Sequence, residues 1–350
     1  MRLMFVYYIM KDAGSAQDIH HYSDAARELG HEIVLYGPPE NDSGFRCSRD
    51  VDWADALVFI FEWTQQLRYG DPLDVLRLMH RVPRDKRIVI DCDGNYNDAL
   101  NVQGDYNHRD AAASQRWIDA CDSLADRVFQ PTLHPKRPNV RPFFFHGYDP
   151  AWEQPLDFDR KEFGMVYVGH SKFRWGPMRR ILDAVEPNLS EVGRLAVVGH
   201  GWDAMPPWAA SMGIEDYYYT DQNCLQRLGV EFVPPVPYEQ VIPWMGRATF
   251  NPVIYRPLFE HLGFVTCRTF ETPAANTIPL FALEDAYVRE VFGEAGCELR
   301  LPIEEAHEKV LDLIRRPRYY ADVVMDVRRH MAQKHSYTAR LQELVDIVRH

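Results

Sequence analysis

The feature that most constrains the fold is an alternation of strand and helix signals that stops once and then resumes. Apolar segments in the first half, such as 56–61 and 87–91, are nearly continuous, and helical segments separate them. Strands of this kind are buried on both faces, which is typical of a parallel sheet covered by helices on both sides. The alternation stops at residues 147–163, which are rich in Pro, Asp and Glu and show little periodicity. We interpret this stretch as an interdomain connection.

This pattern predicts the α/β class, with two Rossmann-like, doubly wound domains whose sheets face each other across a ligand cleft. We place the N-terminal domain at 1–155, the C-terminal domain at 156–335 and a last helix at 336–350. The strands expected are 3–8, 32–36, 56–61, 87–91, 127–130, 141–146, 165–168, 195–198, 230–233, 248–251 and 278–282. The helices expected are 18–29, 72–80, 110–125, 177–185, 238–245, a helix start at 270–275, 286–292, 303–315, 319–334 and 337–348.

Bulk properties narrow the class of protein further. A chain of 350 residues is longer than one compact core usually holds. It has no apolar run of roughly 18 residues, so no membrane span is expected, and its apolar N-terminus is too brief for a signal peptide. Six cysteines without a C-x-x-C pair predict reduced thiols in a cytoplasmic protein. The net charge of -12 argues against a general nucleic-acid surface, because phosphate contacts need clustered Lys and Arg.

A charged pair in the last third of the chain is the strongest functional signal. Arg268 and Glu271 come just before small residues and the apolar run 278–282. Ordinary core sequence does not need an arginine and a carboxylate at this junction. A nucleotide-sugar site does, because an arginine can bind the diphosphate and a carboxylate can accept hydrogen bonds from two ribose hydroxyls.

The order R-x-F-E, small residues, a Pro-Leu-Phe strand and a helix ending near H-S-Y-x-x-R resembles the C-terminal domain of GT-B glycosyltransferases. The branch it is most similar to is the CgeB-like, spore-maturation group, which is related to the retaining family-4 enzymes. The resemblance is clearest from Gly164 to Val348. It implies that a nucleotide sugar binds mainly to the second domain and the acceptor to the first. It also implies retention of stereochemistry, no bound metal, and a last helix that crosses back to the first domain.

The same resemblance assigns the donor site residue by residue. The loop that begins at Gly169 stands where family-4 enzymes have G-R-x-x-x-x-K-G, which gives Lys172 and Arg174 to the diphosphate, although His170 replaces the arginine that follows the glycine. Read alone, this loop could equally be a solvated basic loop. Glu271 aligns with the second acidic residue of the family's E-x7-E pattern, and the first falls on Gly263.

Two further donor positions follow from the resemblance. Tyr238 follows the proline-rich loop at the position that lines the nucleobase in the family. The alternative for this tyrosine is a proline-ordered loop before a helix. Asn251 ends the strand before Pro252, as an asparagine does in the spore-maturation branch.

The first strand–loop–helix unit supplies candidates on the acceptor side. Gly14 and Ser15 lie where the loop meets the helix, and free N–H groups at a helix N-terminus suit a phosphate or a sugar hydroxyl. The G-x-G-x-x-G pattern of dinucleotide binding is absent, and Gly14 could equally be a turn glycine. His20, in the first turns of this helix, is a candidate catalytic group, although a histidine there is more often a surface or packing residue.

Asp91 and Asp93 follow the apolar strand 87–91, at the edge of the sheet where α/β ligand sites form. We expect one of them to approach the acceptor hydroxyl or the reacting sugar, and the alternative is an Asx turn. The D-x-D spelling suits Mg²⁺ or Mn²⁺, but metal-binding D-x-D belongs to the other major glycosyltransferase fold, so no metal is expected.

The function predicted is therefore transfer of a hexosyl-type sugar from a nucleoside-diphosphate sugar, with no cofactor beyond this co-substrate. The acceptor would be a small molecule or a glycan. The alternatives are a GT-B nucleotide-sugar epimerase or phosphorylase, and a sugar-nucleotide-binding protein without activity.

Overall fold

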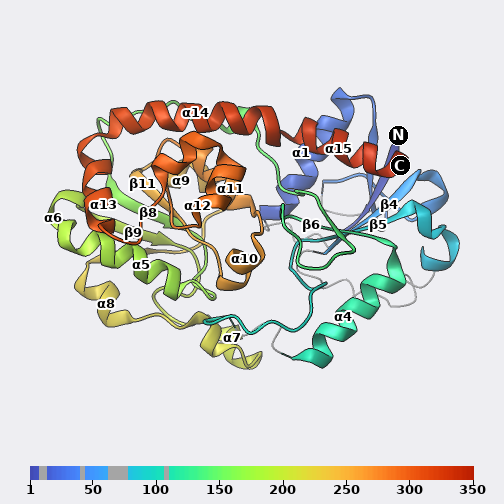
Figure 1. The fold of residues 1–350 in the computed structure, drawn as a ribbon, viewed down its shortest axis with the longest axis horizontal. Coiled ribbons are helices and arrows are strands. Elements are labelled where there is room, and N and C mark those ends of the chain that lie inside the picture. The colour runs from blue at the N-terminus through green and yellow to red at the C-terminus, as the bar shows by residue number, and fades with distance from the viewer. Residues whose placement is uncertain (8–13, 40–43, 62–77, 106–109) are drawn as a thin grey trace.

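Two parallel sheets organise the chain in the computed structural model, which describes residues 1–7, 14–39, 44–61, 78–105 and 110–350 (Figure 1). The first sheet has the strand order β3-β2-β1-β4-β5-β6-β7 and the second the order β10-β9-β8-β11-β12. The first contains β1 (Arg2–Val6), β2 (Glu32–Tyr36), β3 (Cys47–Ser48), β4 (Ala56–Phe61), β5 (Arg87–Asp91), β6 (Arg127–Gln130) and β7 (Val140–Pro142). The second contains β8 (Phe163–Val168), β9 (Leu195–Val198), β10 (Val230–Val233), β11 (Ala248–Val253) and β12 (Ile278–Phe281).

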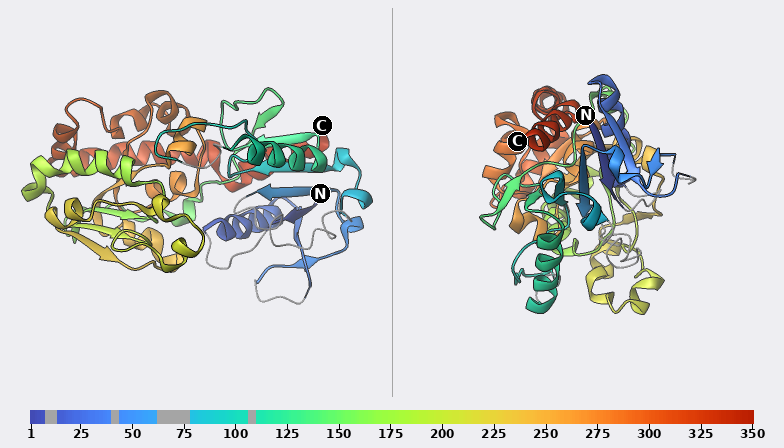
Figure 2. Two further views of the ribbon diagram at one scale, coloured as in Figure 1. Left: turned by 90° about the horizontal axis from the view of Figure 1, so that it is seen from below. Right: turned by 90° about the vertical axis from the view of Figure 1, so that its right-hand side faces the viewer.

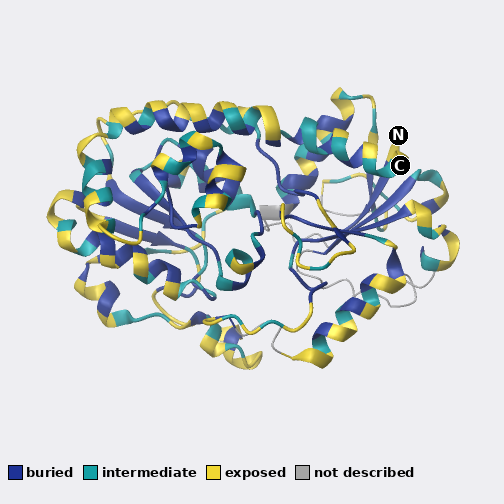
Figure 3. Ribbon diagram, in the orientation of Figure 1, coloured by how far each residue is buried: buried dark blue, intermediate teal, exposed yellow. Residues whose placement is uncertain are grey.

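The strands are buried because their sequences are apolar on both faces. Every residue of β4 and of β8 is buried, and both sheets form the dark interior of their domains in Figure 3. In each sheet the chain starts in the middle, builds outward in one direction and then returns to build in the other. The strand order reverses between β1 and β4 in the first sheet and between β8 and β11 in the second. Ligands of doubly wound folds bind at these switch points.

Helices cover both sheets. The first domain has α1 (Gly14–Glu28) and α4 (Ala111–Leu124). The helices that follow are α5 (Trp175–Val185), α6 (Leu189–Val192), α7 (Pro207–Ser211), α8 (Gln222–Arg227), α9 (Val241–Met245), α10 (Pro257–Leu262), α11 (Cys267–Ala274), α12 (Asp285–Phe292), α13 (Ala306–Arg315), α14 (Pro317–His335) and α15 (Tyr337–Arg349).

The last two helices connect the domains. The long helix α14 runs along the second domain, and α15 lies beside α1 on the first domain, as Figure 1 and the right-hand view in Figure 2 show. Ser336 ends α14 and caps α15 by accepting a hydrogen bond from the N–H of Ala339. Tyr337 and Leu341 of α15 are buried in the same core as strands β1, β4 and β5. The chain therefore returns to complete the domain with which it began.

The predicted α/β class with two doubly wound domains is confirmed, and several strands, such as β4 and β10, agree with the prediction at both ends. The strand expected at 141–146 is wrong in extent, because pairing with β6 stops at Pro142. The helix expected to start at 270 starts at Cys267, where Thr266 and Thr269 form a capping box. The short helix α10 was not predicted. The helix expected at 72–80 falls largely outside the described residues. No helix in the described part of the chain is long and apolar enough to cross a membrane.

Candidate functional site

Four cations converge at the switch point of the second sheet. Lys172 and Arg174 lie on the loop that follows β8, Arg256 follows β11, and Arg268 lies in the first turn of α11. Together with burial, the charges of these four residues lower the pKa of the His170 imidazole well below its usual value. His170 is therefore neutral at physiological pH, and the four side chains, called here the cationic cluster, are close enough to act on one ring.

The loop after β8 is held by specific hydrogen bonds. The Arg174 guanidinium donates to Nδ1 of His170 at 3.0 Å and to the carbonyl of Lys172 at 3.0 Å. The indole N–H of Trp202 donates to the carbonyl of Gly169 at 2.7 Å. Phe173, between the two loop cations, has a left-handed backbone with φ of 58°, which is unusual for a bulky residue. The loop is thus fixed at both ends and strained in its middle.

Lys172 responds to charges in both domains. Burial and the nearby charge of Arg256 lower the pKa of its ammonium to about 8, and the carboxylate of Asp93 acts in the opposite direction. Asp93, which follows β5 in the first domain, is therefore near Lys172, which follows β8 in the second. The two sequence candidates lie in different domains, and their charges act on each other across the interdomain junction.

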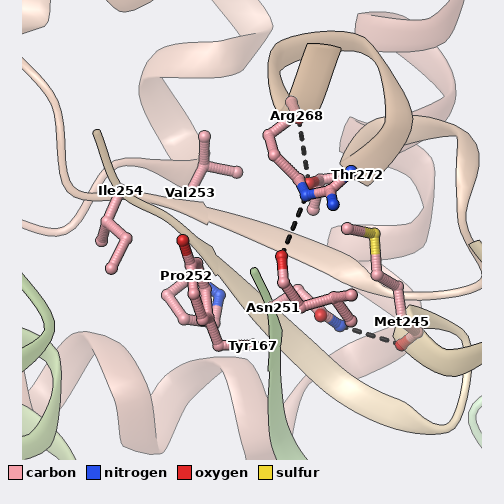
Figure 4. A pocket seen from close by; sticks show the side chains of 9 residues that line it. Tyr167, Met245, Asn251, Pro252, Val253, Ile254, Arg268 and Thr272 are labelled. Atoms are coloured by element: carbon pink, nitrogen blue, oxygen red, sulfur yellow. Dashed lines mark hydrogen bonds between the residues drawn. The ribbon is translucent and has the colours of Figure 1, made fainter. Parts of the chain in front are cut away.

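The helix α11 positions the other half of the predicted donor site. Arg268 donates from Nε to the carbonyl of Val168, at the end of β8, at 2.9 Å, and it forms an ion pair with Glu271 one helical turn away. Glu271 has no exposed surface. Figure 4 shows Arg268 reaching from α11 toward the ends of the strands, where it lines a pocket together with Asn251 and Thr272. Asn251 donates to the carbonyl of Met245 at 2.8 Å and to Thr277 Oγ1 at 2.9 Å.

Gly263, where the family pattern has its first acidic residue, has a left-handed backbone with φ of 63° and ends α10. A glutamate would be strained in that conformation, so this departure from the pattern has a local structural reason.

Tyr238 lies between the two domains. It is half-buried, and burial raises the pKa of its phenol. The charge of Asp18 in α1 adds to this rise, and the charge of Arg268 in α11 opposes it. Asp18 is itself buried and accepts hydrogen bonds from the Tyr337 hydroxyl at 2.5 Å and from Nδ1 of His146 at 3.0 Å. The start of α1, the start of α15 and the segment after β10 therefore meet in one region.

The remaining candidates of the first domain lie in different settings. Asp91 has no exposed surface, and its carboxylate accepts hydrogen bonds from the N–H groups of Asn95 and Tyr96 and from Gln130 Nε2. It holds the turn that carries Asp93. His20 is exposed and stacks on Phe45, with ring centroids 4.1 Å apart. Gly14 and Ser15 begin α1, and the loop before them lies outside the described residues.

Sequence reasoning missed Arg256 and its partner. Arg256 pairs with Asp105 of the first domain through two hydrogen bonds, from Nε at 2.8 Å and from Nη2 at 2.7 Å. The signal available was an arginine in the loop after the strand predicted at 248–251, where the resemblance assigned no role. Asp105 offers no local signal, because it is 151 residues away from Arg256 in the sequence.

Within the described ranges, no group of three or more His, Cys, Asp or Glu side chains is arranged to hold a metal ion. That the reaction needs no bound metal stays a prediction. What the described residues do offer is a cationic cluster of a size and position that suit a diphosphate, with a buried carboxylate beside it.

Comparison with known proteins agrees with this picture. Residues 174–346 match a protein family described as glycosyl transferase-like. No curated protein matches the chain in sequence. The family match includes Arg174, Arg256, Arg268 and Glu271, but it begins after Lys172.

Three solved structures share the fold across both domains. An alpha-glucosyltransferase (AGT) in complex with UDP has a TM-score of 0.64 at 12% identity, covering 100% of this chain and 99% of that one. An alpha-glucosyltransferase in complex with UDP-glucose and DNA containing an abasic site has a TM-score of 0.63 at 12% identity and the same coverage. The T4 phage BGT in complex with UDP and Mn²⁺ has a TM-score of 0.60 at 13% identity, covering 99% of each chain. At such low identity the likeness shows the fold, and it confirms the predicted GT-B arrangement.

Proposed function

We propose that the chain is a glycosyltransferase that moves a sugar from a UDP-sugar to a hydroxyl acceptor. The observation that carries the proposal is the cationic cluster at the switch point of the second sheet, where a doubly wound domain binds a nucleotide. The family match to residues 174–346 supports the reaction class. The structures of similar fold that contain UDP or UDP-glucose support uridine as the base.

The reaction breaks the bond between the sugar C1 and the diphosphate oxygen and forms a bond from C1 to the acceptor oxygen. Negative charge grows on the departing diphosphate, and we assign its stabilisation to the cationic cluster. The neutral His170 adds no charge there but orients Arg174 through their hydrogen bond. We place the acceptor on the first domain near Asp93, which would accept the hydroxyl proton or contact the reacting sugar. Retention of configuration at C1 is part of the proposal.

Glu271 is proposed to bind the ribose. Its carboxylate forms an ion pair with Arg268. A diphosphate would compete for that guanidinium, and the freed carboxylate could then accept the ribose hydroxyls. Binding of the phosphates and of the ribose would thereby be linked through one ion pair.

Calorimetric titration with UDP tests the proposal directly. The intact chain should bind UDP, and Lys172→Met should weaken binding, whereas Lys86→Met, at an exposed lysine of the first domain, should not. Glu271→Ala should remove any preference for UDP over 2′-deoxy-UDP, with a loss of about 1.5–3 kcal/mol for a charge-assisted hydrogen bond. If the wild-type chain binds no nucleoside diphosphate at millimolar concentration, the proposed function is wrong.

Metal independence is part of the same proposal. Donor hydrolysis without acceptor should continue in excess EDTA, because side chains neutralise the diphosphate. Activity that EDTA abolishes and Mn²⁺ restores would refute this, and the neighbour that contains Mn²⁺ makes Mn²⁺ the ion to add back. In the same assay Asp93→Asn should lose activity, and Asp119→Asn, on the exposed face of α4, serves as its control.

The prediction that the acceptor is not a nucleic acid needs its own test. The net charge of -12 motivates it, but a neighbour of similar fold contains DNA. If the prediction is right, duplex DNA should show no binding that weakens as salt is added. Phosphate contacts would make the affinity for DNA fall steeply with salt concentration. Incorporation of labelled sugar into DNA that carries hydroxymethylated bases would overturn it.

A further inference from the structure

The ion pair between Asp105 and Arg256 joins the two domains beside the proposed donor site. Asp105 has no exposed surface, and it also accepts the backbone N–H of Leu258 at 3.2 Å. The Arg256 side chain is 13% exposed, and its two parallel hydrogen bonds to one carboxylate define its orientation. Removing one partner of such a buried pair leaves the other charge uncompensated.

The Arg256 guanidinium lies over two aromatic rings. Its central carbon lies 4.6 Å from the ring centroid of Phe173 and 5.0 Å from that of Phe259. These are cation–π distances. The ring of Phe173 also lies 5.6 Å from Nζ of Lys172. Phe173 is therefore shared between two members of the cationic cluster, one fixed by Asp105 and one facing Asp93.

Phe173 is the strained residue of this loop. A left-handed backbone at a bulky residue persists only where the surroundings hold it. Those surroundings include the Arg256 guanidinium and Tyr217. The Phe173 N–H donates to the Tyr217 carbonyl at 2.7 Å, and the two rings lie 4.4 Å apart. Part of what holds the loop in shape thus comes from the first domain, through Asp105.

We propose that Asp105 is a positioning residue of the donor site. It fixes Arg256, Arg256 fixes Phe173, and Phe173 sets the position of Lys172, so the first domain contributes to diphosphate binding without touching the diphosphate. This inference rests on the proposed function, because it takes the cationic cluster to be the diphosphate site.

The direction in which Asp105→Asn changes UDP affinity distinguishes a positioning role from a purely electrostatic one. Asp105→Asn removes a negative charge close to the cluster, and on electrostatics alone this makes the site more attractive to an anion. If Asp105 acts by positioning, the same change weakens UDP binding despite the added positive potential. Uridine lacks the phosphates, so its affinity should not change. A general loss of folding would instead weaken both ligands.

The experiment is a calorimetric titration of the intact wild-type, Asp105→Asn and Glu231→Gln chains with UDP and with uridine. Glu231 accepts a similar two-point contact from Arg194, at 2.7 and 2.8 Å, at the opposite edge of the second sheet. We expect Asp105→Asn to weaken UDP binding by about tenfold or more, the size of one lost charged hydrogen bond. Uridine binding should stay the same, and Glu231→Gln should match the wild type for both ligands.

Unchanged or tighter UDP binding in Asp105→Asn overturns the inference, and so does an equal loss for UDP and uridine. Phe173→Leu keeps the interdomain pair and should produce the same UDP-selective loss, so the inference can still be refuted if Asp105→Asn does not fold. A wild-type chain that binds no UDP refutes the proposed function and this inference together. A wild-type chain that binds UDP, with no loss in either variant, refutes the inference alone.

Discussion

At the scale of single residues, the charge of Lys172 depends on two domains at once. Burial and Arg256 lower the pKa of its ammonium to about 8, and Asp93 opposes them. A lysine with an ordinary pKa near 10.4 would stay charged throughout the physiological range. In this site the charge that binds the diphosphate begins to disappear only slightly above neutral pH.

UDP affinity should therefore fall as the pH rises from 7 to 9. The protonated form of Lys172 binds the diphosphate, so above its free pKa of about 8 the dissociation constant should increase by up to about tenfold per pH unit. The last ionisation of the phosphate, at about 6, is complete in this range. Lys172→Arg should flatten the profile, because an arginine remains charged. Calorimetry at several pH values measures both slopes, and equal slopes would assign the titration to another group.

At the scale of elements, the helix that carries Arg268 and Glu271 depends on a buried arginine of α14. Arg328 is 3% exposed and donates to the carbonyls of Pro273, Ala274 and Ala275 at the end of α11, with distances of 2.8 to 3.0 Å. It also donates to the carbonyl of Gln154 at 2.9 Å. One side chain thus satisfies the last carbonyls of α11 and fixes the interdomain connection.

Arg328→Met should lower the free energy of unfolding by about 3–5 kcal/mol, because several buried carbonyls lose their donor. The matched control is Arg329→Met. Arg329 is the exposed neighbour on the same helix and pairs only with Asp326 among the contacts described. Arg329→Met should therefore change the free energy of unfolding by no more than about 0.5 kcal/mol. Denaturant unfolding measures both variants. Equal stabilities would show that Arg328 is not needed to end α11.

The junction of α14 and α15 should make stability depend on pH. His335 is 6% exposed, and its Nε2 donates to the carbonyl of Val291 at 3.1 Å. Burial lowers its pKa to about 3, with a smaller contribution from Arg340. Since the unfolded chain binds this proton at about 6.5, the stabilising effect is complete above that pH and is lost as the pH falls toward 3.

His335→Gln keeps a donor for the Val291 carbonyl but cannot titrate. Between pH 6.5 and 4.5 the free energy of unfolding of the wild type should fall by up to about 1.4 kcal/mol per pH unit more than that of this variant. Unfolding by denaturant across that range gives the two slopes. Parallel curves would mean that the imidazole is protonated in the folded protein and that the acid sensitivity lies elsewhere.

Local sequence patterns predicted the strands well and the interdomain contacts not at all. The segment 56–61 is an apolar run between two acidic residues, and 230–233 lies between a glycine and a proline, so their ends are visible in the sequence. The helix α10 was missed because its six residues, Pro257–Leu262, are too few to show a helical period. Asp105 and Arg256 meet only through the tertiary fold. For the site, the residues themselves indicated Arg268 and Glu271, but the ion pair between them follows from the helix that begins at Cys267.

At the scale of the whole molecule, the two domains should respond separately to core mutations. Leu344 in α15 is fully buried in the core around β1, β4 and β5, and Leu313 in α13 is fully buried in the core of the second sheet. Leu344→Ala should lower the free energy of unfolding by about 2–5 kcal/mol. It should reduce hydrogen-exchange protection in β1, β4 and β5 but leave β8 to β12 protected.

Leu313→Ala is the matched control and should give the opposite pattern, with protection lost in the second sheet. Hydrogen exchange read by mass spectrometry resolves the two sheets. Loss of protection in both sheets for both variants would mean that the molecule unfolds as one cooperative unit. In that case α15 would stabilise the whole chain and not the first domain in particular.

The path of α15 also sets an order of events during synthesis. A ribosome releases the N-terminal residues first, and domains generally fold as units while the chain emerges. Here the domain begun first needs Tyr337, Leu341, Leu344 and Val345, which are translated after the whole second domain. The second domain can close its core beforehand, since the buried residues of its main core all precede α15. The nascent chain must therefore keep the apolar face of β1, β4 and β5 uncovered until α15 has been translated, and that face is where a chaperone would be needed.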